Sequence, residues 1–237
     1  MRSRGWTVGA LSACVLLAGC SSQVADPPAL RIAEVVKPSP VRALAQVLPS
    51  GDELATMLGI AGFLGQLVDG GPDLLLQSVG EAEATPAECV GTGYRLQKVV
   101  YGAGSVRTVA SQSWAGGDAN GPSSSGFFGV VQFATPDDAQ QFFAAAADEW
   151  HRCNGQTLVL QRPGSHTSAA SRITGVTVDH NTVSAVVMHD GGSTVQRALG
   201  VASDCVVDVE ISDVAGPDPM GAHDAVSVAN LMLQKID

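Results

Sequence analysis

The second half of the chain consists of short runs in which apolar and polar residues alternate, separated by residues that favour turns. A period of two residues is typical of β-strands, because successive side chains point to opposite faces of a sheet. Asp179-His180-Asn181 and Asp190-Gly191-Gly192-Ser193 have the composition of tight hairpin turns. Strands joined in this way predict an antiparallel meander, with strands over residues 157–161, 175–179, 182–189, 194–201 and 205–211.

Three further strands are expected earlier in the chain. Residues 127–133 alternate clearly, and residues 98–101 and 107–114 are short β-rich runs. The link between those two runs, Gly102-Ala103-Gly104, resembles a hairpin turn. Residues 116–125 are almost all small and polar and are expected to form a loop.

Helices are predicted by capping signals and apolar stripes. Ser50 and Glu53 have the spacing of a capping box, and Thr135 followed by Pro136 is a typical helix start. That second helix should end near residues 152–155, and a last helix should span about 224–236. The glycine-rich stretch 60–85 is expected to form short helical turns. The inner faces are predicted to be Ala139, Phe142, Phe143, Ala146 and Trp150, and then Ala225, Val228, Ala229, Met232 and Leu233.

These elements together indicate an α+β fold, in which helices pack against one face of an antiparallel sheet. The chain has 237 residues, of which 45% are apolar, so it can bury a substantial core. One domain is expected over residues 46–237. The formal net charge of −10 disfavours contact with phosphate backbones, so no nucleic acid partner is expected. No motif predicts a cofactor.

The N-terminal segment has the pattern of a bacterial export signal. Two arginines precede a mostly apolar run over residues 6–17, which is shorter than the roughly 20 residues of a membrane-spanning helix. Leu17-Ala18-Gly19-Cys20 resembles the bacterial lipobox, in which the cysteine is acylated and becomes the first mature residue. We therefore expect a signal peptide over residues 1–19, acylation of Cys20 and a tether over residues 20–45.

This pattern places the protein at the outer, extracytoplasmic face of the cell membrane. The lipid is the expected membrane contact, because no later segment approaches 18 uninterrupted apolar residues. The alternative is an ordinary signal peptide that is cut at a small-residue site and leaves no lipid.

The exported domain retains three cysteines, Cys89, Cys153 and Cys205, because Cys14 lies in the signal segment and Cys20 would carry lipid. An oxidising compartment favours one disulfide among them, and the sequence allows three pairings. No two cysteines have CxxC spacing, and only His151 lies near a cysteine, so no metal site is predicted.

Residues that could carry chemistry lack the local signatures of known enzymes. The chain contains five histidines and many serines but no Gly-x-Ser-x-Gly elbow, so no catalysis is expected. His151 lies at the end of a predicted helix, where histidines commonly contact the last carbonyls. Arg197 and Asp208 lie within strands, where they would form a buried ion pair or, for Arg197, line a cleft. His151, Arg197 and Asp208 are the candidate binding residues.

An ordered set of short motifs runs through these elements. Cys89 follows Pro-Ala-Glu, Trp150-His151-Arg152-Cys153 ends a helix, and Gln196-Arg197-Ala198-Leu199 and Val206-Val207-Asp208-Val209 lie in the last strands. Their order resembles the extracellular sensor domain of mycobacterial transmembrane Ser/Thr kinases of the PknH type and its lipoprotein relatives. The resemblance covers about residues 45–237. It implies a strongly twisted antiparallel sheet and a cleft for an unknown ligand.

The same resemblance implies two disulfides, of which the first would join Cys89 to Cys153. The second would need cysteines near Gly155 and Ser212, which this chain lacks, so Cys205 is expected to be a buried free thiol. The implied function is a lipid-anchored ligand-binding or sensor-like domain without catalysis, whose partner is an unknown small molecule, an envelope component or a protein. The alternatives are a carrier of lipid or glycolipid and an envelope hydrolase.

Overall fold

The computed structural model describes residues 38–80, 83–119, 121–161, 168–213 and 222–236. These residues form a β-sheet and the helices that pack against it. The predicted signal peptide, Cys20 and most of the predicted tether lie outside these residues. The α-helices are α1 (Gly51–Leu58), α2 (Val90–Gly93), α3 (Lys98–Tyr101), α4 (Pro136–Cys153) and α5 (His223–Gln234). The strands are β1 (Gly62–Leu64), β2 (Val68–Gly70), β3 (Ala84–Thr85), β4 (Val106–Asp118), β5 (Gly121–Phe133), β6 (Thr157–Gln161), β7 (Ser168–Asp179), β8 (Thr182–His189), β9 (Thr194–Ala202) and β10 (Cys205–Asp213).

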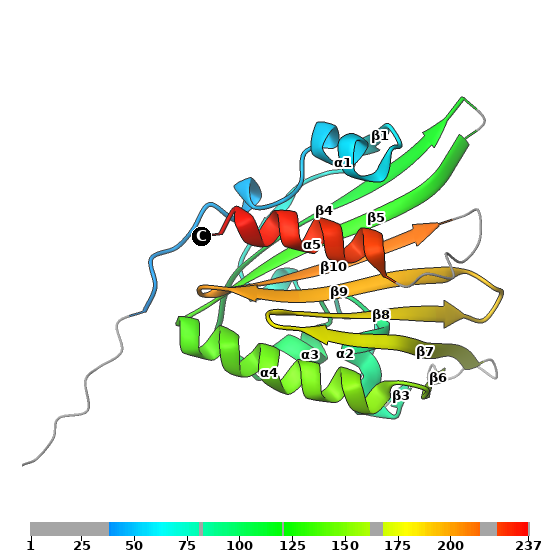
Figure 1. Cartoon of the computed structure of the whole chain (residues 1–237). Coiled ribbons are helices and arrows are strands. Elements are labelled where there is room, and N and C mark those ends of the chain that lie inside the picture. Colours follow the sequence, from blue (N-terminus) through cyan, green and yellow to red (C-terminus); the bar gives the residue numbers. More distant parts are fainter. Residues whose placement is uncertain (1–37, 81–82, 120, 162–167, 214–221, 237) are drawn as a thin grey trace, which may run out of the picture. The chain divides into compact units, whose positions relative to one another are not determined.

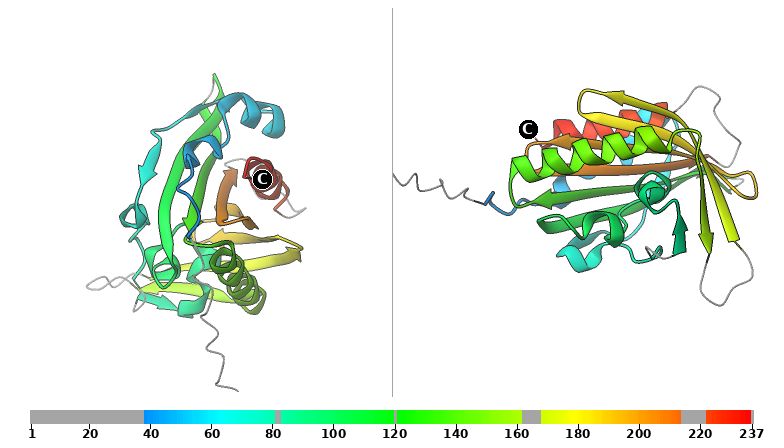
Figure 2. Two further views of the ribbon diagram at one scale, coloured as in Figure 1. Left: turned by 90° about the vertical axis from the view of Figure 1, so that its left-hand side faces the viewer. Right: turned by 90° about the horizontal axis from the view of Figure 1, so that it is seen from below.

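The strands form one antiparallel sheet in the order β1-β4-β5-β10-β9-β8-β7-β6-β3, and β2 pairs with β4 beside β1. The meander from β6 to β10 is confirmed, since each of these strands pairs with the next one along the chain. Figure 1 shows this fan of long strands, and Figure 2 shows how strongly it twists. The α+β prediction with a twisted antiparallel sheet is therefore confirmed.

Helices cover both faces of the sheet, so the expectation that they pack on one face is wrong. Adjacent residues of β10 show this, because Val206 packs in the core cluster that contains the inner side of α4, and Val207 packs in the cluster that contains α5. Side chains alternate along a strand, so the two clusters lie on opposite faces. In Figure 2, α4 and α5 accordingly lie on different sides of the twisted strands. We call the two sides the α4 face and the α5 face.

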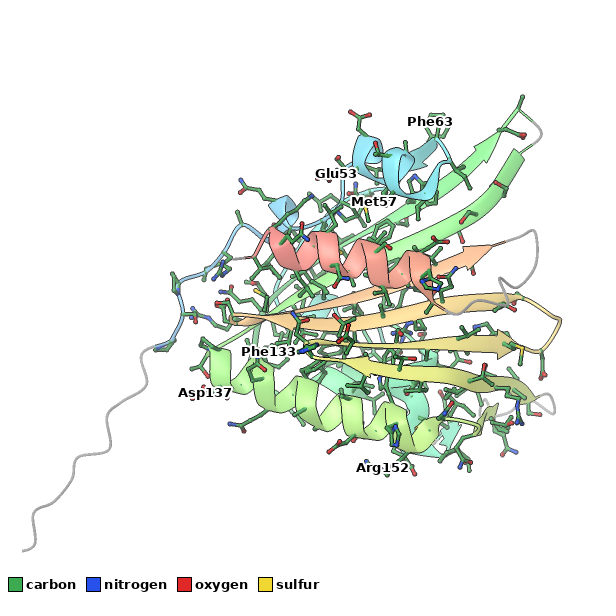
Figure 3. The ribbon with its side chains drawn as sticks, viewed as in Figure 1. Glu53, Met57, Phe63, Phe133, Asp137 and Arg152 are labelled. Carbon is green, nitrogen blue, oxygen red and sulfur yellow. A yellow bond between two sulfur atoms is a disulfide. The ribbon has the colours of Figure 1, made fainter. Side chains whose placement is uncertain are left out.

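Helix α4 begins where its sequence predicts. The Thr135 hydroxyl accepts a hydrogen bond from the Asp138 amide at 3.1 Å, and Pro136 occupies the first turn. Asp137 lies near the start and Arg152 near the end, where each charge opposes the helix dipole (Figure 3). The capping box of α1 is also present, with the Ser50 amide donating to Glu53 at 2.7 Å. The five residues predicted as the inner face of α5 are all buried.

Two predicted extended or loop segments have a different structure. Residues 98–101 form helix α3 rather than a strand, because the Lys98 amide donates to the Leu76 carbonyl and the Leu96 amide to Asp208, and these contacts turn the chain. Residues 116–125 are not a loop but belong to the long β4–β5 hairpin, in which Ser124 pairs with Asp213 of β10 as well as with Gly116. Ladder hydrogen bonds on both sides of β5 override the weak strand propensity of glycine and serine.

The glycine-rich stretch 60–85 also differs from its prediction. Its described residues contain the helical turn Pro72–Leu74 and the short strands β1, β2 and β3. Strands β1 and β2 pair with β4, and β3 pairs with β6 at the other edge of the sheet. Phe63 in β1 is 86% exposed, and Figure 3 shows its ring at the outer surface.

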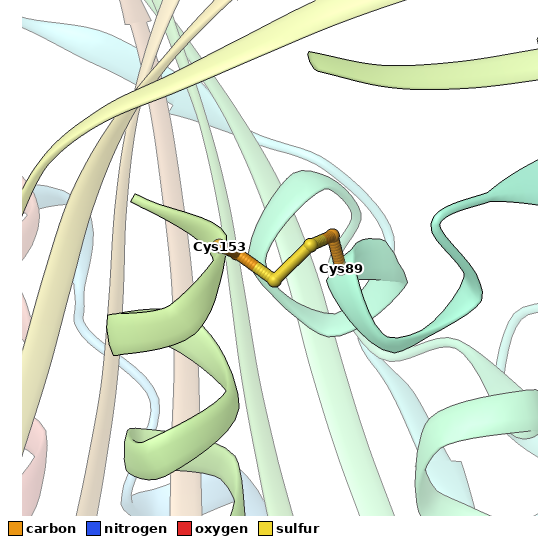
Figure 4. The surroundings of a disulfide bond; sticks show 2 residues. All are labelled: Cys89 and Cys153. Atoms are coloured by element: carbon orange, nitrogen blue, oxygen red, sulfur yellow. A yellow bond between two sulfur atoms is a disulfide. The ribbon is translucent and has the colours of Figure 1, made fainter. Parts of the chain in front are cut away.

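One disulfide joins Cys89 to Cys153, which confirms the pairing implied by the family resemblance. It links the last residue of α4 to the helical turn that precedes α2 (Figure 4). The sequence separation of 64 residues corresponds to a loop-entropy contribution of about 4 kcal/mol. Cys205 is free and buried, as expected, and burial together with the nearby Asp204 charge raises the pKa of its thiol to about 12.

Arg42 fastens the N-terminal end of the domain to the β9–β10 turn and to the C-terminus. Its guanidinium donates to Asp204 at 2.9 Å, to the Ile236 carbonyl at 2.8 Å and to the Ser203 hydroxyl at 3.1 Å. Burial raises the pKa of Asp204, but hydrogen bonds from Gln132 and Ser39 and the Arg42 charge outweigh it, so the net pKa is lowered. Within the described ranges, no helix is long and apolar enough to cross a membrane.

Candidate functional site

Two of the predicted binding residues meet in the interior of the α4 face. Arg197 of β9 and Asp208 of β10 form an ion pair at 2.7 Å, and their side chains are 0% and 2% exposed. Both lie on the strand faces that point toward α4, because Arg197 shares its face with the buried Val195 and Leu199, and Asp208 shares its face with the buried Val206. Such a pair persists in a low-dielectric interior only when hydrogen bonds satisfy the remaining polar atoms.

The carboxylate of Asp208 meets that requirement. Its second oxygen accepts hydrogen bonds from the Leu96 amide at 2.9 Å and from the Tyr101 hydroxyl at 3.0 Å. Burial, followed by the charge of Asp208, raises the pKa of Tyr101 well above its ordinary value, so the phenol remains a donor. Asp208 thereby holds the segment between α2 and α3 on the sheet.

The guanidinium of Arg197 is only partly satisfied. One nitrogen, Nη2, bonds to Asp208 and weakly to the Gly91 carbonyl at 3.4 Å. Nε and Nη1 have no hydrogen-bond partner among the described residues, although Nη1 lies 3.6 Å from a Glu210 oxygen. The Trp150 ring lies 5.7 Å from the guanidinium carbon and contributes a cation–π contact. Buried donors without acceptors are rare in folded proteins, so these two nitrogens require an explanation.

A half-exposed layer of charged and aromatic groups lies next to this buried arginine. Glu210 forms an ion pair with Arg95, and their side chains are 18% and 32% exposed. The Arg95 guanidinium also lies over the Phe127 ring, at 4.1 Å from its centroid. Phe127, Glu210 and Arg197 are cross-strand neighbours on β5, β10 and β9, so the sheet register sets their order. The Nε atom of Arg95 likewise has no partner among the described residues.

His189 completes this layer at the end of β8. Its Nδ1 lies 2.7 Å from the Ser171 hydroxyl, which in turn contacts the Tyr94 hydroxyl at 3.3 Å. Burial lowers the pKa of His189, and the Arg197 charge adds to this effect, whereas Glu210 and Asp190 oppose it. The imidazole is therefore neutral at pH 7 and offers one donor and one acceptor. We refer to Tyr94, Arg95, Phe127, His189, Arg197, Asp208 and Glu210 as the arginine cluster.

The third predicted binding residue, His151, is in a different position. Its side chain is exposed on the last turn of α4, and no hydrogen bond or ion pair described for the folded region joins it to Arg197 or Asp208. Its carbonyl accepts a hydrogen bond from the Asn154 amide, which closes the helix end. The structure thus brings Arg197 and Asp208 together and leaves His151 outside their contacts.

Sequence reasoning missed Tyr94, Arg95, Phe127, His189 and Glu210. A signal for Glu210 was present, because residues 206, 208 and 210 share one face of a strand and two of them are carboxylates. Arg95 had no such signal, since it comes from an irregular segment whose position depends on Asp208.

Comparison with known proteins gives the family. The model of the PknH-like extracellular domain matches residues 39–235 of the chain. The chain belongs to this PknH-like extracellular domain family. The match takes in nearly all of the described residues, so the domain is a sensor-like extracytoplasmic domain.

Two solved structures are similar to the chain to different degrees. The crystal structure of the extracellular domain of PknH from Mycobacterium tuberculosis is similar, with a TM-score of 0.70 at 21% identity, covering 84% of this chain and 97% of that chain. A putative uncharacterized protein from Mycobacterium smegmatis has a TM-score of 0.41 at 14% identity, covering 81% of this chain and 94% of that chain. No curated protein matches the chain.

Proposed function

We propose that this PknH-like domain binds a small ligand at the arginine cluster and acts as a lipid-anchored sensor-like domain without catalysis. The observation that supports ligand binding is the buried guanidinium of Arg197, whose Nε and Nη1 have no hydrogen-bond partner among the described residues. A buried charged donor left unsatisfied costs free energy, and an acceptor supplied by a ligand would recover it. Glu210, which lies 3.6 Å from Nη1, and its partner Arg95 are partly exposed, so a ligand would approach the donor from their side.

The cluster favours a ligand that joins a carboxylate to a flat apolar body. A carboxylate matches the planar fork of a guanidinium and would replace Glu210 beside the two arginines. The rings of Phe127 and Tyr94 would supply the adjacent aromatic surface. Phe127 stacks against the Arg95 guanidinium, and the Tyr94 ring lies 6.1 Å from the His189 ring. The expected ligand is therefore a small aromatic or cyclic carboxylic acid.

Benzoate is a suitable probe for this proposal. We expect benzoate to shift the amide NMR signals of β5, β9 and β10 in the full-length chain in detergent, and acetate and benzyl alcohol to shift them far less. Arg95→Met keeps the apolar stem and removes the charge, so it should weaken benzoate binding about tenfold or more. The matched control is Arg152→Met, at the exposed end of α4. Equal binding by both variants, or shifts confined to other elements, would refute the assignment.

The lipid anchor rests on the sequence around Cys20. The residues after Cys20 are polar and contain Pro27 and Pro28, a composition that suits a tether. Cys20→Ala should prevent incorporation of labelled fatty acid and release the protein from the membrane fraction, because acyl chains supply the membrane affinity. Cys14→Ala, which changes the other cysteine of the leader, should leave both properties intact. Fatty-acid labelling that persists in Cys20→Ala would contradict the anchor.

The proximity of Ser171 and His189 is the observation that favours an envelope hydrolase as a second candidate. Ser171 is 1% exposed, and no carboxylate among the described residues hydrogen-bonds to the His189 ring. A nucleophile must be accessible, and its base is commonly oriented by a third group. We expect no hydrolysis of p-nitrophenyl acetate above that of the Ser171→Ala variant. Turnover lost in this variant would support the hydrolase.

A further inference from the structure

A polar cavity lies on the α5 face, away from the arginine cluster. It has a volume of about 450 Å³ and is bounded by the β7–β8 hairpin and the first turns of α5. That volume lies within the range of small-molecule sites. Side chains of hydroxyl, amide and imidazole type line it: Thr177, Asn181, Thr182, Ser184, His223 and Asn230.

Thr182 is the residue that indicates a missing ligand group. It is 5% exposed, and its hydroxyl has no hydrogen-bond partner in the described part of the chain. Its cross-strand partner on β9 is Gly200, which brings no side chain to the hydroxyl. Thr182 and Ser184 alternate with the buried Val183 and Ala185 of the α4 face, so both hydroxyls point to the α5 side. A buried hydroxyl without a partner costs free energy, and a valine of the same shape would avoid that cost. The hydroxyl is therefore favoured here only if a ligand supplies its partner.

The hairpin is shaped around this cavity. The β7–β8 pairing shifts register between Thr174 and Thr177, where Gly175 has a φ of +61°. A bulge of this kind bends a strand and redirects its side chains. The ladder resumes at Thr177, which pairs with Ser184, and Gly175 and Thr177 both line the cavity beside this bulge.

The charge of the lining disfavours an anion as the natural ligand. Among the described residues, no lysine or arginine lines the cavity, whereas Asp179 does. The amides of Asp224 and Ala225 at the start of α5 already donate to the Gln196 side chain, at 2.9 and 3.4 Å. The positive end of the helix dipole is thus occupied by a protein acceptor. Hydroxyls and amides supply both donors and acceptors, which is the pattern that vicinal hydroxyl groups require.

We infer that this cavity binds a neutral polyhydroxylated molecule, a mono- or disaccharide unit. The site is independent of the arginine cluster, because it lies on the opposite face of the sheet and shares no residue with it. Each sugar hydroxyl both donates and accepts, and Thr182, Ser184, Asn181 and Asn230 would engage such groups from two sides. Val226 provides the apolar contact for a ring face.

Saturation-transfer NMR on the full-length chain in detergent tests this inference with glucose, galactose and maltose as probes. We expect at least one of them to receive saturation at concentrations up to about 10 mM, which covers weak binding. Thr182→Val and Asn230→Ala should each weaken that sugar about tenfold, the loss of roughly one hydrogen bond. Ser227→Ala, an exposed change on α5 outside the cavity, should bind like the parent.

Thermal unfolding separates binding from folding in these variants. Thr182→Val removes an unsatisfied hydroxyl without changing the side-chain shape, so its Tm should equal or exceed that of the parent. Absence of transfer to all three sugars would overturn the inference, as would equal transfer in the parent, Thr182→Val and Asn230→Ala. Binding of inorganic phosphate in place of the sugars would also overturn it, because the lining would then select an anion.

Discussion

The two faces of the sheet are each covered by one long helix, but different interactions hold these helices in place. Helix α4 is fixed by the Cys89–Cys153 disulfide and packs over the Arg197–Asp208 ion pair. Helix α5 packs through its buried apolar side chains, and Gln196 of β9 caps its first turn. The α4 face therefore combines covalent and ionic constraints, whereas the α5 face relies mainly on apolar packing.

This difference indicates how each face can serve a ligand. A site with charged groups in the interior needs its surroundings held at fixed positions, because a misplaced partner leaves a charge unpaired. The disulfide and Asp208 provide that rigidity beside the arginine cluster. The cavity on the α5 face presents neutral groups, for which small displacements cost less.

Removal of the disulfide should have the largest effect on this comparison. Cys89→Ser with Cys153→Ser is expected to lower the free energy of unfolding by about 4 kcal/mol, since the 64-residue separation is no longer constrained in the unfolded chain. Chemical denaturation measures this loss. Cys205→Ala provides the control, because that thiol forms no disulfide. It should lower the free energy of unfolding by much less than the double variant does. A loss under about 1 kcal/mol would show that α4 is held without its bridge.

Disruption of the buried ion pair should rank next. Asp208→Asn leaves the Arg197 charge without its counterion and is expected to cost about 3 kcal/mol in urea denaturation. The double variant Arg197→Met with Asp208→Asn removes both charges, keeps an oxygen that can accept from Leu96 and Tyr101, and should recover part of this loss. If the double variant is as unstable as the single one, the charge is not the cause.

On the α5 face, truncation of a core side chain should cost about 2–3 kcal/mol. Met232→Ala is the variant, because Met232 is fully buried on the inner side of α5, and Met188→Ala at 40% exposure is the control. Hydrogen exchange should show faster opening of α5 with α4 still protected, if the two faces are held independently. Equal loss of protection in both helices would contradict this separation.

The smallest effect concerns pH. The pKa of His189 is lowered in the folded state, so below its ordinary value near 6.5 the unfolded chain binds more protons than the folded one. Stability should consequently fall as the pH drops from about 7 toward 5, and His189→Gln should reduce that slope. His151→Gln, a change at an exposed histidine, is the control. An unchanged slope in His189→Gln would place the titrating group elsewhere.

Much of the fold could be predicted from local signals. The start of α4 at Thr135-Pro136, the β6–β10 meander and the inner face of α5 follow from capping residues and from periods of 2 and 3.6 residues. The predictions failed where long-range contacts override local preference. Residues 98–101 have valines suited to a strand but form a helical turn, because Leu76 and Asp208 hold the neighbouring backbone.

The candidate site was predictable only in part. Arg197 and Asp208 were identified because charged residues inside apolar strands must find a partner. Arg95 and His189 were not identified, because they come from distant segments of the chain. The sheet register and the hydrogen bond from the Leu96 amide to Asp208 bring these segments together. The same limit applied to Thr182, whose unpaired hydroxyl depends on Gly200 opposite to it.

The sequence by itself determined the fold class, the long helices, the strand meander and the identity of the buried ion pair. These features depend on local propensity and on the requirement that apolar side chains and buried charges be compensated. Only the tertiary structure decided that α4 and α5 cover opposite faces, which half-exposed groups surround Arg197, and where the polar cavity lies. The physical reason is that a strand presents side chains to two faces, and periodicity does not specify which helix covers which face.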